Sequence, residues 1–253
     1  MNKYLSIITL NETVLNFPSK RHTVAEYIRK PDSHICCLQA THLRPKDIHR
    51  LKVEDWKKYS KQMDGGKKAR VAILISDKID FKTSTSKDHK KRHRRTFIIL
   101  KERLHQEDIN SVNIYAPNIG APKYTRKILE DFKKDIDSNT IMSGDFNTPL
   151  SIMDRSSKQN INKDIAALNN VLDQMDLTEI YRTFHSIEAK YTFFSNAHGT
   201  FSKIDHIIGH KTSHNKFKNT EFISSIFVDC NGLKLETNLK EKSAKIFKLM
   251  ESE

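Results

Sequence analysis

Short, β-rich apolar runs recur along almost the whole chain, and they constrain its fold more than any other feature. Several, such as Val71–Ser76 and Phe97–Leu100, are nearly continuous in apolar residues, which is typical of strands buried on both faces. We predict strands at Leu5–Leu10, His34–Leu38, Val71–Ser76, Phe97–Leu100, Ser111–Tyr115, Thr140–Ser143, Tyr191–Phe194, Ile204–Ile208 and Leu233–Glu236.

Three segments between these runs have the spacing of amphipathic helices. Lys20–Lys30, Pro122–Asp137 and Asn162–Met175 each carry apolar side chains three and four residues apart, which places them on one stripe of a helix. Strands and helices mix without strict alternation, so we expect an α+β sandwich, with two sheets and the helices outside. No linker or internal repeat divides the chain. We predict one domain over residues 1–238 and a charged tail over 239–253.

The chain is strongly basic. Lys and Arg number 44 against 31 Asp and Glu, which gives a formal charge of +13. Such an excess attracts a polyanion, most commonly nucleic acid, although a generic basic surface is the alternative. The densest basic run, Lys87–Arg95, lies between two predicted strands. This run is either a solvated loop or a surface that follows phosphates, and the second case predicts affinity that falls with salt.

Other function classes are excluded by composition. No run of about 18 residues is free of charge, so we predict no membrane span, and the N-terminus does not have the pattern of a signal peptide. Three cysteines, Cys36, Cys37 and Cys230, cannot form a disulfide framework, which indicates an intracellular protein of the nucleus or cytoplasm. Glycine is scarce, and no glycine-rich phosphate loop is present.

One motif indicates chemistry. Ser143–Pro149 follows an apolar run and carries Asp145 and Asn147, which lie on the same side of an extended backbone because they are two residues apart. One of them can accept a proton or orient a nucleophile, and the other can donate to a phosphate oxygen. This pairing suits the hydrolysis of a phosphodiester.

The order of the motifs extends this reading. From about Ile7 to about Glu236 the chain resembles the endonuclease/exonuclease/phosphatase superfamily, and it is most similar to the apurinic-type endonuclease domain of LINE-1 retrotransposons. The motifs that carry the resemblance, in chain order, are Thr9–Asn11, Cys37–Leu43, Asn113–Asn118, Gly120–Pro122, Ser143–Leu150, Asp154–Ser156, Tyr181–Thr183, Tyr191–Ser195 and Ser202–Ile207.

The resemblance implies a four-layered α/β sandwich of two mixed β-sheets flanked by helices. Its active site lies at one end, where strand ends and loops converge. It implies a monomeric enzyme that nicks double-stranded DNA with a divalent cation, usually Mg²⁺ or else Mn²⁺.

The resemblance also assigns roles to individual residues. Asn11 matches the active-site Asn at the metal end of the site, and Tyr115 matches the Tyr that contacts the scissile phosphate. Asp145 matches the carboxylate that orients or deprotonates the attacking water, and Asn147 matches the amide that binds phosphate.

Further positions match with less specific roles. Asp205 matches another active-site Asp, and Asp229 matches the acid that holds the catalytic histidine. Four residues match positions that line the DNA groove or the pocket for a flipped nucleotide; each of them could equally be an ordinary surface or core residue: Arg155, Thr192, Ser202 and Ile204.

Several positions depart from the family pattern, and among them Glu12–Leu15 replace its Asn-Gly-containing turn after Asn11. Ala40 stands where the family has the Glu that is the main metal ligand, and Cys230 stands where it has the catalytic His. Arg70 replaces a small Gly before a strand. A positioned acid–base group contributes roughly 10²–10⁴-fold to a rate, and Mg²⁺ is held by only one or two carboxylates. We therefore expect weakened metal binding and very low or absent nuclease activity.

Two other functions compete with an impaired endonuclease. The first is a non-catalytic nucleic-acid-binding module derived from the same domain. The second is a phosphatase of the same superfamily that acts on phosphoinositides or sphingomyelin, which the charge of +13 and the retrotransposon-type motifs disfavour.

Overall fold

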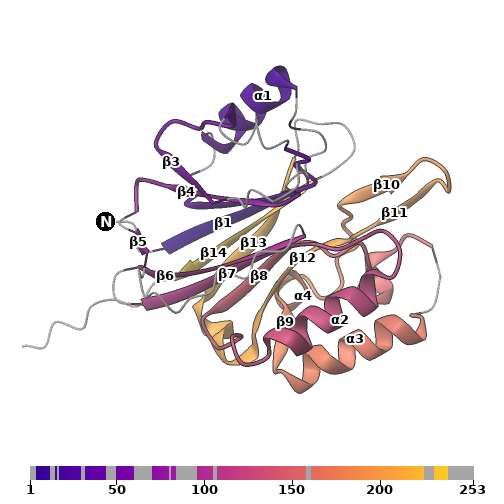
Figure 1. The fold of residues 1–253 in the computed structure, drawn as a ribbon. Coiled ribbons are helices and arrows are strands. Elements are labelled where there is room, and N and C mark those ends of the chain that lie inside the picture. Colours follow the sequence, from indigo (N-terminus) through magenta and orange to yellow (C-terminus); the bar gives the residue numbers. More distant parts are fainter. Residues whose placement is uncertain are drawn as a thin grey trace, which may run out of the picture.

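Two stacked β-sheets form the centre of the molecule, and helices cover their outer faces (Figure 1). The computed structural model describes residues 4–11, 15, 17–29, 32–43, 50–59, 70–79, 81–83, 96–104, 107–157, 161–224 and 231–238. Lys87–Arg95, Asp229, Cys230 and the tail from residue 239 lie outside these ranges.

The first sheet has six strands in the order β13-β14-β1-β2-β4-β3. Strands β1 and β2 run parallel, and the other neighbours in this sheet are antiparallel. Its strands span Tyr4–Asn11 (β1), Ile35–Gln39 (β2), Trp56–Tyr59 (β3), Ala72–Ser76 (β4), Phe217–Ile223 (β13) and Gly232–Asn238 (β14).

The second sheet also has six strands, in the order β5-β6-β7-β8-β12-β9. Strands β7 and β8 run parallel, and the remaining pairs are antiparallel. Its strands span Phe81–Thr83 (β5), Phe97–Leu104 (β6), Glu107–Tyr115 (β7), Thr140–Asp145 (β8), Leu177–Glu179 (β9) and Asp205–His210 (β12). A separate hairpin of β10 (Phe193–Ser195) and β11 (Thr200–Ser202) projects from one end of the sandwich (Figure 1).

Helices complete the outer layers. Helix α1 (Pro18–Arg29) covers the first sheet, and α2 (Ala121–Phe132) and α3 (Lys163–Gln174) lie side by side on the second (Figure 1). Shorter turns are α4 (Ile180–Phe184), η2 (Ile152–Asp154) and η3 (Lys211–Lys216). The Asn162 side chain begins α3 by accepting from the backbone N–H of Ile165 at 2.9 Å.

The continuous apolar runs follow from this layering. In β1, Ile7 points into the core between the sheets, whereas Ile8 points outward and packs under α1. In β8, Ile141 lies between the sheets and Met142 lies under the outer helices. Because both faces of each sheet are covered, successive residues must all be apolar.

A buried polar network joins the two sheets near one end. The Gln39 amide at the end of β2 donates to the Asn113 side-chain oxygen of β7 at 2.7 Å. Asn113 donates in turn to the carbonyls of Leu38 and Ala72 at 3.0 and 2.9 Å. Gln39 also donates to the Thr9 hydroxyl at 3.0 Å. The network fixes β1, β2, β4 and β7 relative to one another where they approach the candidate site.

The predicted architecture is confirmed, with shifts at element ends. The second predicted helix ends at Phe132 instead of Asp137, and the strand predicted at Tyr191–Phe194 begins only at Phe193. The first of these shifts arises because Lys133–Ile136 form tight turns, in which Asp135 donates its N–H to the Phe132 carbonyl at 2.8 Å. Sequence patterns missed β3, β5, β9, β11, β13 and α4. All but β13 contain too few residues to show a period, and β13 has seven residues of which only two are buried. Within the described part of the chain, no helix is both long and apolar enough to cross a membrane.

Candidate active site

Asp145 lies at the centre of the site, at the carboxyl end of β8. It is buried, and its carboxylate accepts from the Asn147 backbone N–H at 2.8 Å and from the side-chain amides of Asn11 and Asn147 at 2.6 and 3.2 Å. The bond from Asn11 crosses between the sheets and joins the end of β1 to the end of β8. Three residues that the sequence placed in the site are therefore in direct contact.

Local backbone geometry brings these groups together. Gly144 has a φ of +139°, and a Cβ atom there would lie 2.0 Å from the Ile114 carbonyl oxygen, so only glycine allows β8 to approach β7 this closely. Asn147 has a φ of +47°, in the left-handed region that Asn tolerates. Its side chain also donates to the Ala116 carbonyl at 2.8 Å, so both amide hydrogens of Asn147 are engaged within the site.

A second carboxyl group lies directly across from the first. Asp205 begins β12, and its Cα is the cross-strand partner of the Asp145 Cα. Burial raises the pKa of Asp145 to about 7, against the hydrogen bonds that favour its ionised form. Burial, followed by the negative charge of Asp145, raises the pKa of Asp205 well above its ordinary value. Near neutral pH the two groups therefore compete for one negative charge.

Several acceptor atoms in the site lack donors. Both carboxyl oxygens of Asp205 and the side-chain oxygen of Asn11 are buried without a hydrogen-bond partner among the described residues. The Thr192 hydroxyl accepts from the backbone N–H groups of Ile204 and Asp205 at 3.0 and 3.2 Å. Burial raises the pKa of Asp205, and this neighbouring hydroxyl acts in the opposite direction. Unpaired buried oxygens are costly unless a proton or a cation satisfies them.

Ala40 occupies the position directly after β2, and its side chain is only a methyl group. It is buried, and its φ of +50° is unusual for a residue with a side chain. Gln39, its neighbour, is held by the network that joins the sheets. The backbone next to Ala40 is thus held in place, while the Ala40 side chain offers no oxygen.

The donor set does not fit a complete metal site. Mg²⁺ prefers carboxylate oxygens, and both oxygens of Asp145 already accept N–H bonds. In the residues that the structure describes, no three His, Cys, Asp or Glu side chains lie close enough together to hold a metal ion. Asp205 and Asn11 retain free oxygens, but the strand end at Ala40 supplies none, so we derive no catalytic step through a metal.

Tyr115 belongs to the site and not to the core alone. Its Cα pairs with that of Asp145 at the ends of β7 and β8, and the side chain is half-buried. Burial and then the charge of Asp145 raise the pKa of Tyr115, while the Arg70 guanidinium acts in the opposite direction. The Arg70 guanidinium carbon lies 5.9 Å from the centre of the Tyr115 ring.

The predicted groove residues surround the base of the β10–β11 hairpin. Arg155 and Ser202 form a β-bridge there, and both are half-buried. The Ile204 carbonyl accepts from the N–H of Phe146, the residue directly after Asp145, at 2.9 Å. Thr192 is buried, so its hydroxyl fixes the start of β12 and does not face solvent. Asn231 donates its N–H to the Thr192 carbonyl at 3.2 Å, which brings the chain after Cys230 close to the site.

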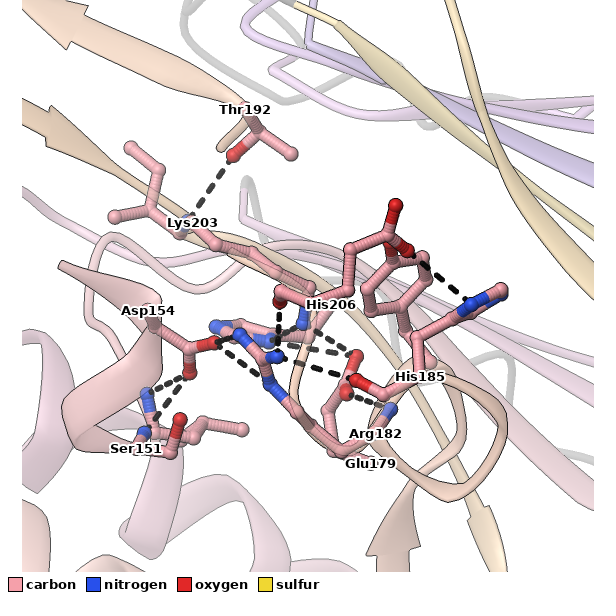
Figure 2. Close-up of polar contacts among 12 residues, drawn as sticks. Ser151, Asp154, Glu179, Arg182, His185, Thr192, Lys203 and His206 are labelled. Atoms are coloured by element: carbon pink, nitrogen blue, oxygen red, sulfur yellow. Dashed lines mark hydrogen bonds and ion pairs between the residues drawn. The ribbon is translucent and has the colours of Figure 1, made fainter. Parts of the chain in front are cut away.

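Sequence reasoning missed a buried ion cluster beside the site, which we call the Lys203 cluster: Asp154, Glu179, Arg182, Lys203 and His206 (Figure 2). The Lys203 ammonium is fully buried, 2.7 Å from a Glu179 oxygen and 3.1 Å from His206 Nδ1. Arg182 Nη2 lies 2.6 Å from Asp154. One signal in the sequence could have indicated this cluster. Motifs that carried the resemblance contain four of its members: Asp154, Arg182, Lys203 and His206.

The Lys203 cluster supports the loop after Asn147. Asp154 accepts from the backbone N–H groups of Leu150 and Ser151 at 3.0 and 2.9 Å. His206 Nε2 lies 3.0 Å from the Thr148 carbonyl, an atom that only accepts, so this nitrogen carries the hydrogen. These bonds hold the segment that follows Asp145 against β12.

Solved structures of the same architecture match nearly the whole chain. The endonuclease domain of TRAS1, a telomere-specific non-LTR retrotransposon, aligns with a TM-score of 0.70 and 12% identity over 94% of this chain and 100% of that one. The AP endonuclease LMAP from Leishmania major gives 0.72 and 12% over 94% and 89%. The 3′ phosphatase NExo from Neisseria, bound to a product DNA hairpin, gives 0.70 and 16% over 93% and 100%. At these identities the likeness shows the fold.

A sequence model of one family assigns membership. The model of the Endonuclease/Exonuclease/phosphatase family matches residues 5–224, which include both sheets up to β13 and every described candidate site residue. Nucleases of this family generally depend on a divalent metal ion. On the match and the fold together, this nuclease-like chain belongs to the Endonuclease/Exonuclease/phosphatase family.

Proposed function

We propose that this chain is a retrotransposon-type DNA endonuclease domain in which the hydrolysis of phosphodiesters is severely impaired. The observation that carries the proposal is the contrast between Asp145 and Ala40. Asp145 keeps a full set of positioning contacts with Asn11 and Asn147, whereas Ala40 brings a methyl group to the adjoining strand end.

The residues that remain suit part of the chemistry. A pKa of about 7 places Asp145 near the value at which a carboxylate accepts a proton from water efficiently at neutral pH. Tyr115 lies beside it and can contact a phosphate oxygen with its hydroxyl. Asn147 can donate to phosphate only by giving up its contact of 3.2 Å with Asp145, the longer of its two side-chain bonds.

The expected loss is large because the missing parts act together. A metal ion supplies several kcal/mol of charge stabilisation in the transition state. A missing general acid or base costs roughly 10²–10⁴-fold in rate. With Ala40 at one position and Cys230 at another, we expect activity to fall by orders of magnitude relative to a complete site.

A second candidate function is nucleic-acid binding without cleavage. The formal charge of +13 favours it, since most of the energy of nonspecific DNA binding comes from phosphate contacts that need no intact catalytic centre. The two functions differ in one measurable property. An endonuclease nicks DNA in the presence of metal, whereas a binding module shows salt-dependent binding without cleavage.

The test is nicking of supercoiled plasmid in Mg²⁺ and in Mn²⁺, by the native chain and by the double variant Ala40→Glu with Cys230→His. We expect the native chain to be silent and the double variant to nick at least roughly 10²-fold faster, because one change restores a metal ligand and the other an acid–base group.

The matched control keeps the size of the new side chain at position 40 and removes its carboxylate. Ala40→Gln with Cys230→His should therefore remain silent. Asp145→Ala in the double variant should abolish nicking. If the native chain nicks as fast as the double variant and Asp145→Ala removes that activity, the proposed impairment is wrong.

A further inference from the structure

Arg70 occupies a position at the site that no assigned role explains. It directly precedes Val71 and β4, and β4 is antiparallel to β2, so the start of β4 lies beside the end of β2. Its carbonyl accepts from the Thr41 N–H at 3.1 Å. Arg70 therefore sits against the turn that contains Ala40.

The Arg70 side chain reaches across to the other sheet. Its guanidinium carbon lies 5.9 Å from the centre of the Tyr115 ring, and the residue is only partly exposed. Contact with an aromatic face holds a guanidinium in place and leaves its N–H groups free at the edge of the plane. The backbone of Tyr115 in turn pairs with that of Asp145, so the cation lies against a residue of the candidate site.

Among the described residues, Arg70 differs from the cations of the Lys203 cluster in having no counter-ion. Lys203 is paired with Glu179, and Arg182 is paired with Asp154. Among the described residues, no carboxylate lies within 4.0 Å of the Arg70 guanidinium. A glutamate at position 40 would be the natural candidate to neutralise it, and Ala40 provides none.

We propose that Arg70 binds a backbone phosphate of nucleic acid directly, so that the site takes a phosphodiester without a divalent cation. The inference rests on the proposed DNA binding and goes beyond it by naming the group that replaces the metal in holding substrate. A guanidinium suits this role because its planar fork matches two phosphate oxygens at once.

The experiment measures binding of a fluorescently labelled duplex by anisotropy, in EDTA and in Mg²⁺, over a range of salt concentrations. We expect the native chain to bind equally well in both. Arg70→Gln should weaken binding roughly tenfold or more, and it should lower the slope of log affinity against log salt by about one. Arg70→Lys, which keeps the charge and loses the fork, should lie between the two.

Lys218→Gln is the matched control. The Lys218 ammonium also lies over a tyrosine ring, 5.0 Å from the centre of Tyr4, but at the opposite end of β1 from Asn11. The change removes one positive charge, one ring contact and an ion pair with Glu236 at 3.7 Å, all away from the site. It should alter affinity much less than Arg70→Gln does.

The outcomes separate the inference from the proposed function. If the native chain does not bind duplex DNA in either buffer, both fail. If it binds and Arg70→Gln matches Lys218→Gln, the role of Arg70 alone is overturned, and the same holds if binding needs Mg²⁺. A measurement on the native chain avoids the risk that a variant misfolds. Dimethyl phosphate added in EDTA should shift the ¹⁵N resonance of the Arg70 guanidinium. If that resonance does not shift with dimethyl phosphate or with saturating duplex DNA, the contact is refuted.

Discussion

The candidate site and the Lys203 cluster each contain two buried carboxyl groups, and they differ in how the charge of these groups is balanced. Asp154 and Glu179, in the Lys203 cluster, face cations at 2.6 and 2.7 Å. Asp145 and Asp205, in the candidate site, face amides and each other, and no described cation pairs with them. Similar burial thus produces opposite shifts of the carboxyl pKa values in these two parts of the molecule.

The pKa values follow this difference. Burial alone would raise the pKa of both carboxyls in the Lys203 cluster. The nearby charges of Lys203 and His206 instead bring the pKa of Asp154 and of Glu179 down to about 2. In the site, burial raises the pKa of Asp145 to about 7, and Asp205 also shifts upward. A compensated cluster stabilises the scaffold, whereas an uncompensated one costs stability and is kept where chemistry requires it.

The largest expected effect comes from removing the central cation of the compensated cluster. Lys203→Met leaves Glu179 buried without its partner, which should reduce the free energy of unfolding by roughly 3–5 kcal/mol. Urea denaturation at pH 7 measures the change. The control, Lys211→Met, breaks an exposed pair with Asp173 and should cost no more than about 1 kcal/mol. Equal losses for the two variants would contradict the assigned role of the cluster.

The pH dependence of stability should show both groups with opposite signs. Asp154 and Glu179 have depressed pKa values, so their contribution is present above the unfolded values near 4 and is lost as pH falls toward about 2. Asp145 has a raised pKa, so its contribution is present below 3.8 and is lost as pH rises through about 7. Stability measured by thermal unfolding should therefore rise from pH 2 to between 4 and 5. The contribution from the site should then fall toward pH 7.

A substitution in the uncompensated pair should stabilise the protein. Asp205→Asn removes a buried carboxyl group without a partner, and at pH 8 we expect a gain of roughly 1–3 kcal/mol. The gain should shrink at pH 4, where Asp205 is protonated. Carboxyl ¹³C titration in the same variant should show a lower pKa for Asp145, because a like charge has been removed. A loss of stability at pH 8 would show that Asp205 has a cationic partner in the folded protein.

A smaller effect is expected where the site joins the hairpin. Thr192→Val keeps the shape of the side chain and removes the hydroxyl that accepts from the N–H groups of Ile204 and Asp205. The expected cost is about 1–2 kcal/mol, since two buried donors lose their acceptor. Faster hydrogen exchange at these two amides, compared with amides of β14, locates the effect. Unchanged exchange there would remove Thr192 from the support of β12.

Much of the fold could be read from the chain. The apolar runs and helical stripes predicted two covered sheets because a strand buried on both faces must be apolar at consecutive positions. Asp145 and Asn147 could be selected because they follow an apolar run within one motif, whereas Tyr115 was selected only through the resemblance. The short elements β9 and α4 could not, since three to five residues carry no measurable period.

The composition of the site depended on packing. Asn11 meets Asp145 across 134 positions of sequence, and Arg70 reaches Tyr115 from the other sheet. Nothing in the sequence indicated that Lys203 is buried. Its ion pair with Glu179 offsets the free-energy cost of removing its charge from water.

The sequence by itself determined which residue types were present, including the missing carboxylate at Ala40 and the added cation at Arg70. It also determined the layers, because the periodicity of apolar side chains is a local property. Only the tertiary structure decided which charges are balanced. That balance depends on distances between side chains from different strands, and these distances are set when the two sheets pack together.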